Sequence, residues 1–171
     1  GMKSPTSTNI IDYFEIATTG NTTDFGDLTA ARIGPSAASS STRGVFQGGN
    51  TDPSYVNTMD FVEIASQGNA IDFGDLTVVV GYASGTSNSV RGINQGGWSG
   101  SSALNVIDYM TIASHGASID FGDLTEARYG NGAVSNAHGG LNDGYQGTRP
   151  IPVGSGRGLM AGGYVGDPSA K

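Results

Sequence analysis

Hydrophobic and polar residues alternate in short segments along the whole chain, and the segments are separated by glycine, serine, asparagine and proline. Apolar residues at every second position, with turn residues at intervals of about ten, are typical of short antiparallel strands. In residues 58–66, Met59 and Phe61 fall on one side of the predicted strand, and Val62 and Ile64 fall on the other. Because both sides carry apolar residues, the pattern predicts small sheets that are covered on both faces.

The pattern recurs with a period of 48 residues. Residues 10–29, 58–77 and 106–125 match at most positions, and each copy ends with the letters DFGDLT. A fixed period of this length is the signature of architectures built from one repeated unit. We therefore expect a single repeat domain over residues 2–171.

Four extended segments fit into one period, with the letters ARIGPSAAS, RGVFQGG, TMDFVEIAS and AIDFGDLT. The chain starts with counterparts of the third and fourth segments and finishes with counterparts of the first and second. The phase of the repeat therefore predicts two complete four-stranded units with a half unit at each end.

The order of these segments resembles the kelch motif. Ala-Arg-x-Gly, a run of small residues, Arg-Gly before a double glycine, and an aspartate beside an aromatic residue follow one another as in that family, whose period is about 50 residues. The resemblance implies an all-β fold of kelch-like β-propeller blades, each with four antiparallel strands. The near-identical copies also resemble glycine-rich repeat proteins of phage and marine viruses, which implies association with a virion.

Propellers close with about four to eight blades, so three blades' worth of strands needs a partner. We expect a homodimer in which the C-terminal half blade of one chain pairs with the N-terminal half blade of the other, giving six blades around a two-fold axis. The alternatives are a monomer with internal three-fold symmetry, as in a β-prism or β-trefoil, and higher rings or fibrils.

The letters DFGDLT predict a structural role in every unit. The phenylalanines and leucines are expected to fill gaps between blades, and the glycines to supply a bulge or a positive φ. These residues are Phe25, Phe73, Phe121, Leu28, Leu76, Leu124, Gly26, Gly74 and Gly122. The aspartates of the motif predict local turns, with calcium binding as the alternative.

Charged residues also recur at fixed positions. We expect Asp12, Asp60 and Asp108 to bond to the backbone of a neighbouring strand. The three arginines that open the second strand of each unit are predicted to pair with an aspartate of the adjacent blade, or alternatively to line a channel; they are Arg43, Arg91 and Arg157. A second arginine row, Arg32 and Arg128, is interrupted by Val80.

Composition narrows the chemistry. The chain has no cysteine, which excludes disulfides, thiolate metal sites and a cysteine nucleophile. Its formal charge of -7 disfavours nucleic acid and anionic membrane surfaces as partners. The longest apolar runs are too short to span a bilayer and no signal-peptide pattern is present, so we expect a soluble protein of unassigned compartment.

One insertion distinguishes the last unit: eighteen additional residues within about 136–156. Insertions in repeat proteins often form loops on the binding face, although this one is equally expected to pack over a joint of the ring. The single tryptophan is predicted to pack at the ring edge, and stacking on a sugar or anchoring a protein contact is the alternative that would make it a binding residue. The candidate ligand-binding residues are therefore Trp98, His138, Asn142, Asp143, Tyr145 and Arg149.

The sequence predicts a non-catalytic structural or binding protein that assembles with itself. The two histidines occur in different contexts, and no motif predicts a catalytic site, a metal site or a cofactor. A virion or fibre component, a protein-binding scaffold and a glycan-binding, lectin-like module are the candidate roles. A hydrolase is less favoured, because facing carboxylates would arise only through the symmetry of the repeat.

Overall fold

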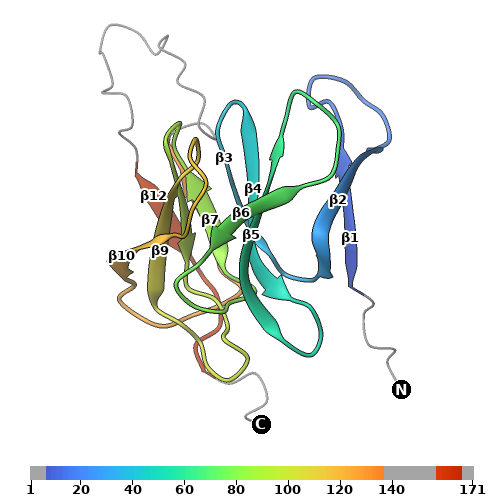
Figure 1. Cartoon of the computed structure of the whole chain (residues 1–171). Coiled ribbons are helices and arrows are strands. Elements are labelled where there is room, and N and C mark those ends of the chain that lie inside the picture. The colour runs from blue at the N-terminus through green and yellow to red at the C-terminus, as the bar shows by residue number, and fades with distance from the viewer. Residues whose placement is uncertain (1–6, 137–156, 167–171) are drawn as a thin grey trace, which may run out of the picture.

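The computed structural model describes residues 7–136 and 157–166 (Figure 1). This part of the chain forms twelve β-strands and no helix. The strands are β1 (Thr8–Tyr13), β2 (Thr23–Arg32), β3 (Ser36–Ser39), β4 (Arg43–Asn50), β5 (Tyr55–Glu63), β6 (Ile71–Asp75), β7 (Ser84–Ser87), β8 (Arg91–Gln95), β9 (Val106–Thr111), β10 (Ile119–Asp123), β11 (Gly132–Ser135) and β12 (Gly158–Ala161).

The strands form four antiparallel sheets in which sequence neighbours pair. Two sheets have four strands, in the orders β3-β4-β5-β6 and β7-β8-β9-β10, and two have only two strands, β1-β2 and β11-β12. The predicted all-β class with antiparallel sheets is confirmed. Within the described residues, β1 has no partner other than β2, and β12 has none other than β11.

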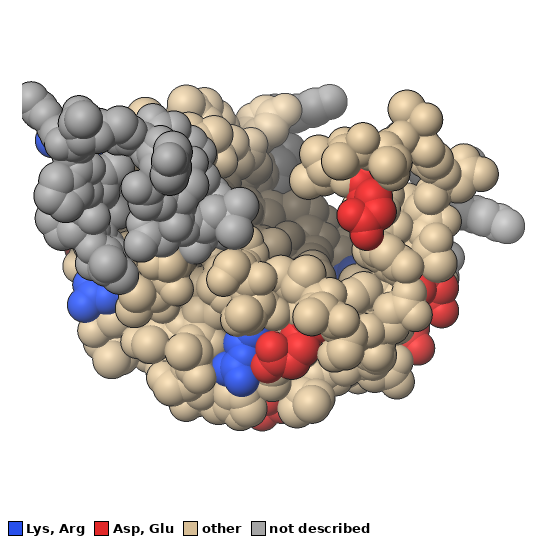
Figure 2. Space-filling view, turned by 90° about the horizontal axis from the view of Figure 1, so that it is seen from above, with Lys and Arg blue, Asp and Glu red and all other residues tan. Residues whose placement is uncertain are grey.

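The sheets stand side by side, with their first strands nearest to one another. Strand β7 contacts β3 on one side and β11 on the other, and at the outside β2 contacts β6. The β1-β2 and β11-β12 sheets lie on opposite sides of the molecule (Figure 1). Seen from above, the described surface carries few charged side chains and is hollowed near its centre (Figure 2).

Alternation along the strands distributes side chains between two cores. Val45 of β4 enters a core shared by the two four-stranded sheets, whereas its neighbour Phe46 packs on a second core with Phe25 and Leu28. Met59 and Val62 of β5 divide between the same two cores. The four-stranded sheet β3–β6 is therefore covered on both faces, as the apolar pattern predicts.

The DFGDLT motif forms a bulge. Met59 pairs with Gly74 and Asp60 pairs with Asp72, so Phe73 is the additional residue and its side chain enters the core. Gly74 has a φ of 139°, and a Cβ added to it would lie 2.3 Å from the carbonyl oxygen of Gly116. Glycine is needed here both for the backbone conformation and for the close approach of the next sheet.

Candidate functional site

The candidate site is the set of surfaces by which one sheet joins the next. We call these contacts joints: the first lies between β1-β2 and β3–β6, and the second between β3–β6 and β7–β10. At the first joint, the N–H groups of Gly68 and Ala70 donate to the carbonyl oxygens of Phe25 and Asp27, at 2.8 and 2.7 Å. The second joint repeats these two bonds through Gly116 to Phe73 and Ser118 to Asp75. The outer edge of one sheet thus receives a loop from the sheet that follows.

Apolar side chains fill the second joint. The β3–β6 sheet contributes Val45, Met59 and Phe73 to one buried cluster, and the β7–β10 sheet contributes Met110 and Ile112. All five are buried. Each fully buried side chain of this kind contributes about 1.5–3 kcal/mol, so this cluster is a principal source of adhesion between the sheets.

A buried carboxylate connects the sheets at the first joint. The N–H and Oγ1 of Thr29 donate to the two carboxylate oxygens of Asp60, at 3.1 and 2.8 Å. Arg32 places Nη2 at 2.6 Å from Oδ2 of the same carboxylate, and both charged side chains are buried. Burial lowers the pKa of Arg32, and the negative charge of Asp60 acts in the opposite direction.

The second joint has an equivalent buried carboxylate, that of Asp108, with a valine in place of the arginine. Asp108 accepts bonds from the N–H and Oγ1 of Thr77, at 2.9 and 2.7 Å, and from Oγ of Ser118 at 3.2 Å. Val80, which is buried, stands where the first joint has Arg32. The prediction that these aspartates bond to a neighbouring strand is confirmed for Asp60 and Asp108.

Arg43, the first of the arginines that open the second strands, has a different partner from the one predicted. Arg43 pairs through Nε with Glu63 of its own sheet at 2.7 Å, and its guanidinium lies over the ring of Phe61. Its Nη1 donates to the carbonyl oxygens of Ile112 and Ala113 at 3.2 and 3.0 Å. The predicted aspartate partner is wrong for Arg43, because the register of β4 on β5 sets Glu63 opposite it.

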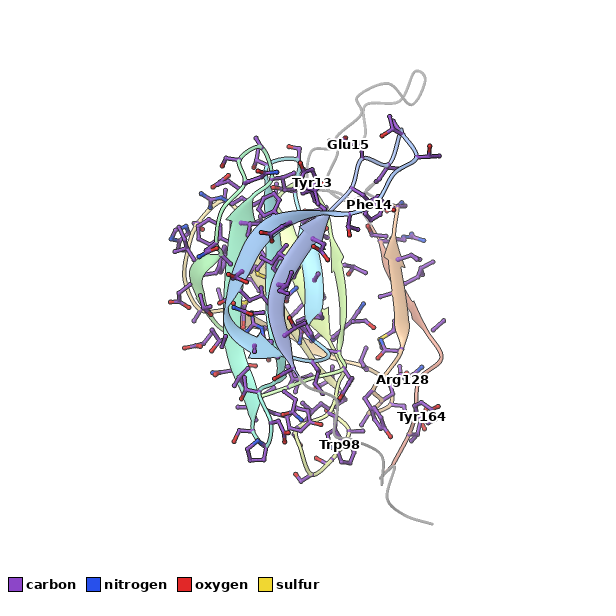
Figure 3. The ribbon with its side chains drawn as sticks, turned by 90° about the vertical axis from the view of Figure 1, so that its right-hand side faces the viewer. Tyr13, Phe14, Glu15, Trp98, Arg128 and Tyr164 are labelled. Carbon is purple, nitrogen blue, oxygen red and sulfur yellow. The ribbon has the colours of Figure 1, made fainter. Side chains whose placement is uncertain are left out.

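Equivalent positions differ sharply in exposure at the two ends of the array. Phe14, which follows β1, is 64% exposed, whereas its counterparts Val62 and Met110 are 8% and 3% exposed. Leu159 of β12 is 65% exposed, whereas its counterpart Val45 is fully buried. Phe14 lies with Tyr13 and Glu15 at one end of the view in Figure 3, and Arg128 and Tyr164 lie at the other.

The outer edge of β10 is open as well. Phe121 is 57% exposed, whereas Phe73 at the same position of β6 is 2% exposed. A Cβ added to Gly122 would meet nothing within 4 Å, in contrast to Gly74. No described loop covers Phe121, so the prediction that it fills a gap between blades stays a prediction.

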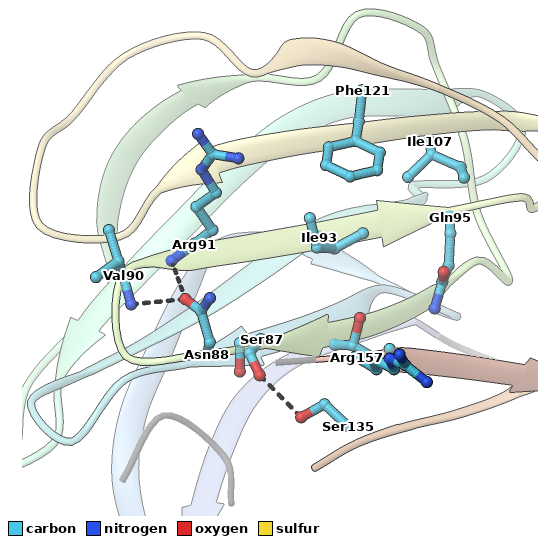
Figure 4. A pocket seen from close by; sticks show the side chains of 12 residues that line it. Ser87, Asn88, Val90, Arg91, Ile93, Gln95, Ile107, Phe121, Ser135 and Arg157 are labelled. Carbon is cyan, nitrogen blue, oxygen red and sulfur yellow. Dashed lines mark hydrogen bonds between the residues drawn. The ribbon is translucent and has the colours of Figure 1, made fainter. Parts of the chain in front are cut away.

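A cavity of about 630 Å³ opens between the β7–β10 and β11-β12 sheets (Figure 4). Its lining combines arginine side chains with apolar ones, and includes Arg91, Ile93, Ile107, Phe121, Ser135 and Arg157. Arg91 holds its guanidinium over the ring of Tyr109, with 4.6 Å to the ring centroid. Ile93, Ile107 and Phe121 are the counterparts of Val45, Met59 and Phe73, which are buried in the second joint.

The predicted ligand-binding residues are only partly described. Trp98 is buried, and its ring packs at 5.1 Å from that of Tyr129, which stacks on Tyr164. Tyr164 is the exposed aromatic at this position (Figure 3). His138, Asn142, Asp143, Tyr145 and Arg149 lie outside the described residues, as does most of the predicted insertion.

Neither a scan against protein-family models nor a search of curated proteins finds a match to this chain. The resemblance to kelch repeats and to viral repeat proteins therefore stays a prediction. Residues 7–136 and 157–166 hold no group of three or more histidine, aspartate or glutamate side chains placed to bind a metal ion. The same ranges contain no helix that is long and apolar enough to cross a membrane.

Sequence reasoning missed the exposed members of this site, Phe14, Ile16 and Leu159. The signal was present in the repeat alignment, because each of these residues is the counterpart of a core position in a complete unit. An apolar residue that keeps a core position at the edge of a repeat array indicates a surface that is covered by something else.

Proposed function

We propose that this protein is a non-catalytic, self-assembling scaffold in which β12 of one copy pairs with β1 of a second copy. Joining a β11-β12 sheet to a β1-β2 sheet yields a sheet of four strands, in the order found for β3–β6. Two copies joined at both ends then form a ring of six sheets around a two-fold axis, with the kelch-like propeller architecture.

The contrast in exposure between equivalent positions carries this proposal. Leu159 and Phe14 are exposed, whereas Val45, Val62 and Met110 at the same repeat positions are buried. Unpaired strand edges that present apolar side chains associate with further strands unless they are covered. The β1-β2 sheet lacks the first two strands of a complete unit, and the β11-β12 sheet lacks the last two. Each of these sheets in one copy can therefore supply the strands that the other lacks in a second copy.

The pairing register follows from the four-stranded sheets. Arg43 is opposite Glu63, and Val45 is opposite Phe61, in the β4–β5 pair. The same register would set Arg157 opposite Glu15 of the second copy, and Leu159 opposite Tyr13. An ion pair and an arginine over an aromatic ring, as found for Arg43, would then form once in each of the two joined sheets.

Rigid sheets joined in this way suit a structural role, such as a component of a virion or fibre, or a scaffold that presents loops to a protein or glycan partner. Trp98 is buried against Tyr129, so the single tryptophan adds nothing to the glycan-binding alternative. The assembly role is the one that the described surfaces favour.

The proposal is tested by the mass of the protein in solution. Sedimentation analysis is expected to give twice the 17.3 kDa of one chain, and Leu159→Lys is expected to raise the dimer dissociation constant at least about 100-fold. The lysine would bury an unpaired charge at each junction, whereas in a single chain it would be exposed.

The matched control is Ile71→Lys. Ile71 is exposed although it belongs to a complete sheet, and its counterpart Ile119 is exposed too, so this change is expected to leave the mass unaltered. A wild-type protein that stays at 17.3 kDa at high concentration would contradict the proposal. Larger rings or fibrils would show that the halves pair without two-fold closure.

A further inference from the structure

We infer that the cavity between the β7–β10 and β11-β12 sheets is the receiving slot for a second copy, filled by Phe14 and Ile16 and fixed by an ion pair between Asp12 of that copy and Arg128. This inference rests on the proposed self-assembly and specifies how a joint forms between copies. We call it the intermolecular joint. Its geometry is argued from the two joints within the chain.

The apolar part of the slot has a filled equivalent. At the second joint, Met110 and Ile112 pack in one buried cluster with Val45, Met59 and Phe73. The cavity has the same kind of wall, formed by Ile93, Ile107 and Phe121, without a described side chain inserted into it. The repeat counterparts of Met110 and Ile112 are Phe14 and Ile16, and both are exposed in the single chain.

The arginine in the slot has a predicted set of acceptors. Arg43 donates to the carbonyl oxygens of Ile112 and Ala113 across the second joint. Arg91 is the counterpart of Arg43 and lines the cavity, and the corresponding acceptors are the carbonyl oxygens of Ile16 and Ala17 of the second copy. These two bonds would hold the end of the incoming β1 strand.

The outer edge of β10 completes the slot. Gly116 donates its N–H to the carbonyl oxygen of Phe73 at the second joint, and the equivalent pair is Gly20 of the second copy and Phe121. The space over Gly122 is open in the single chain, whereas a Cβ added to its counterpart Gly74 would meet the carbonyl oxygen of Gly116.

The ion pair is the most specific element. Arg32 and Thr29 both bind the buried carboxylate of Asp60 at the first joint. Their counterparts at the intermolecular joint are Arg128 and Thr125 of one copy and Asp12 of the other. In the single chain Asp12 is exposed, and Arg128 is half-buried with a long 3.7 Å contact to Glu126. The intermolecular joint is therefore of the arginine type, like the first joint and unlike the second.

A second copy is the occupant because no other segment among the described residues has the required order. The β1-β2 hairpin supplies an aspartate, an aromatic side chain and an isoleucine at the spacing of Asp60, Val62 and Ile64 in β5. It also supplies the glycine-containing loop that the β10 edge lacks. Charge complementarity between Asp12 and Arg128 favours the same occupant.

The test is charge exchange between two variants, followed by sedimentation analysis. Asp12→Arg alone and Arg128→Asp alone place like charges at every intermolecular joint, and each is expected to raise the dimer dissociation constant at least about 100-fold, as for a buried ion pair that loses one member. Mixing the two variants in equal amounts is expected to restore dimers, because both joints of the mixed dimer then have opposite charges. The matched control is Asp72→Arg, which reverses the charge of an exposed residue of β6, outside the intermolecular joint. It is expected to leave the dimer dissociation constant unchanged.

The outcomes separate this inference from the proposed function. A wild-type monomer would overturn both. If the wild type is a dimer and both single variants remain dimers, the slot inference is wrong and the proposed self-assembly stands. The same conclusion follows if the variants fold but do not form dimers when they are mixed. Phe14→Ala is the second variant in case a charge reversal prevents folding: Phe14 is exposed in the single chain, and its loss is expected to weaken the dimer at least about 30-fold. An unchanged dissociation constant for Phe14→Ala would also overturn the slot.

Discussion

Replacing Asp60 by asparagine is expected to lower the free energy of unfolding by about 3–5 kcal/mol, the cost of removing one member of a buried ion pair. The change leaves the guanidinium of Arg32 buried with its charge unpaired, since Nη2 now lies 2.6 Å from Oδ2 of Asp60. Urea-induced unfolding measures the loss, at one fixed protein concentration because association shifts apparent stability.

The matched control is Asp108→Asn, the same change at the same repeat position. Asp108 accepts hydrogen bonds from Thr77 and Ser118, and Val80 replaces the arginine, so a smaller loss of about 1–3 kcal/mol is expected. Adding Arg32→Val to Asp60→Asn should recover part of the stability, because it removes the stranded charge. Equal losses for the two asparagine variants, without recovery in the double variant, would show that the ion pair of Arg32 and Asp60 does not make the predicted contribution to the free energy of unfolding.

Replacing Gly85 by alanine is expected to destabilise the protein by about 3 kcal/mol or more, at the upper end of the range for overpacked sites. A Cβ at this position of β7 would lie 1.8 Å from the carbonyl oxygen of Ala37 in β3. The obstructing atom belongs to the backbone and cannot rotate away, so the two central strands would have to separate. Thermal and urea unfolding of the variant measure the effect.

Gly132→Ala is the comparison for this second prediction. Nothing lies within 4 Å of a Cβ added there, and the counterparts of Gly132 are Ser36 and Ser84, which already carry side chains. The expected change is within about 0.5 kcal/mol, as for most surface substitutions. Similar losses for Gly85→Ala and Gly132→Ala would contradict the close approach of β3 and β7.

Much of the fold could be predicted from the sequence because the repeat samples the same pattern several times. The letters RGVFQGG and TMDFVEIAS fall on β4 and β5, and the turn residues separate the strands where expected. The stretch ARIGPSAAS is divided between two strands: Ala31 and Arg32 end β2, and Ser36–Ser39 form β3, because Gly34 with a φ of 64° interrupts the backbone between them. Period and alternation thus locate strands, and the local backbone decides their length.

The partners of charged residues could not be predicted in the same way. A repeat alignment shows that Arg43, Asp60 and Arg32 occupy recurrent positions. It does not show how far apart the residues at two such positions lie in the folded chain. Arg43 is predicted to pair with an aspartate and pairs with Glu63, whereas Arg32, for which the sequence predicts no partner, is buried and paired with Asp60. The difference arises from the register of β4 on β5 and from the packing of β2 against the next sheet, neither of which is encoded in one segment alone.

The alignment also gave equal roles to residues with unequal surroundings. Phe25 and Phe73 are buried and Phe121 is exposed, although the three share one motif. Burial depends on the following sheet, and the described chain provides such a sheet for two of the three copies. Exposure of a repeated core residue is therefore a property of position in the array.

Because Val80 stands at the position of Arg32, the array has two kinds of contact between sheets, and these gain unequally from a rise in temperature. Hydrophobic contacts such as those of Val80 weaken on cooling. The desolvation penalty of a buried ion pair such as that of Arg32 falls on heating. Hydrophobic stabilisation levels off on heating while the ion pair still gains, so on heating the joint with the valine should open before the salt-bridged joint.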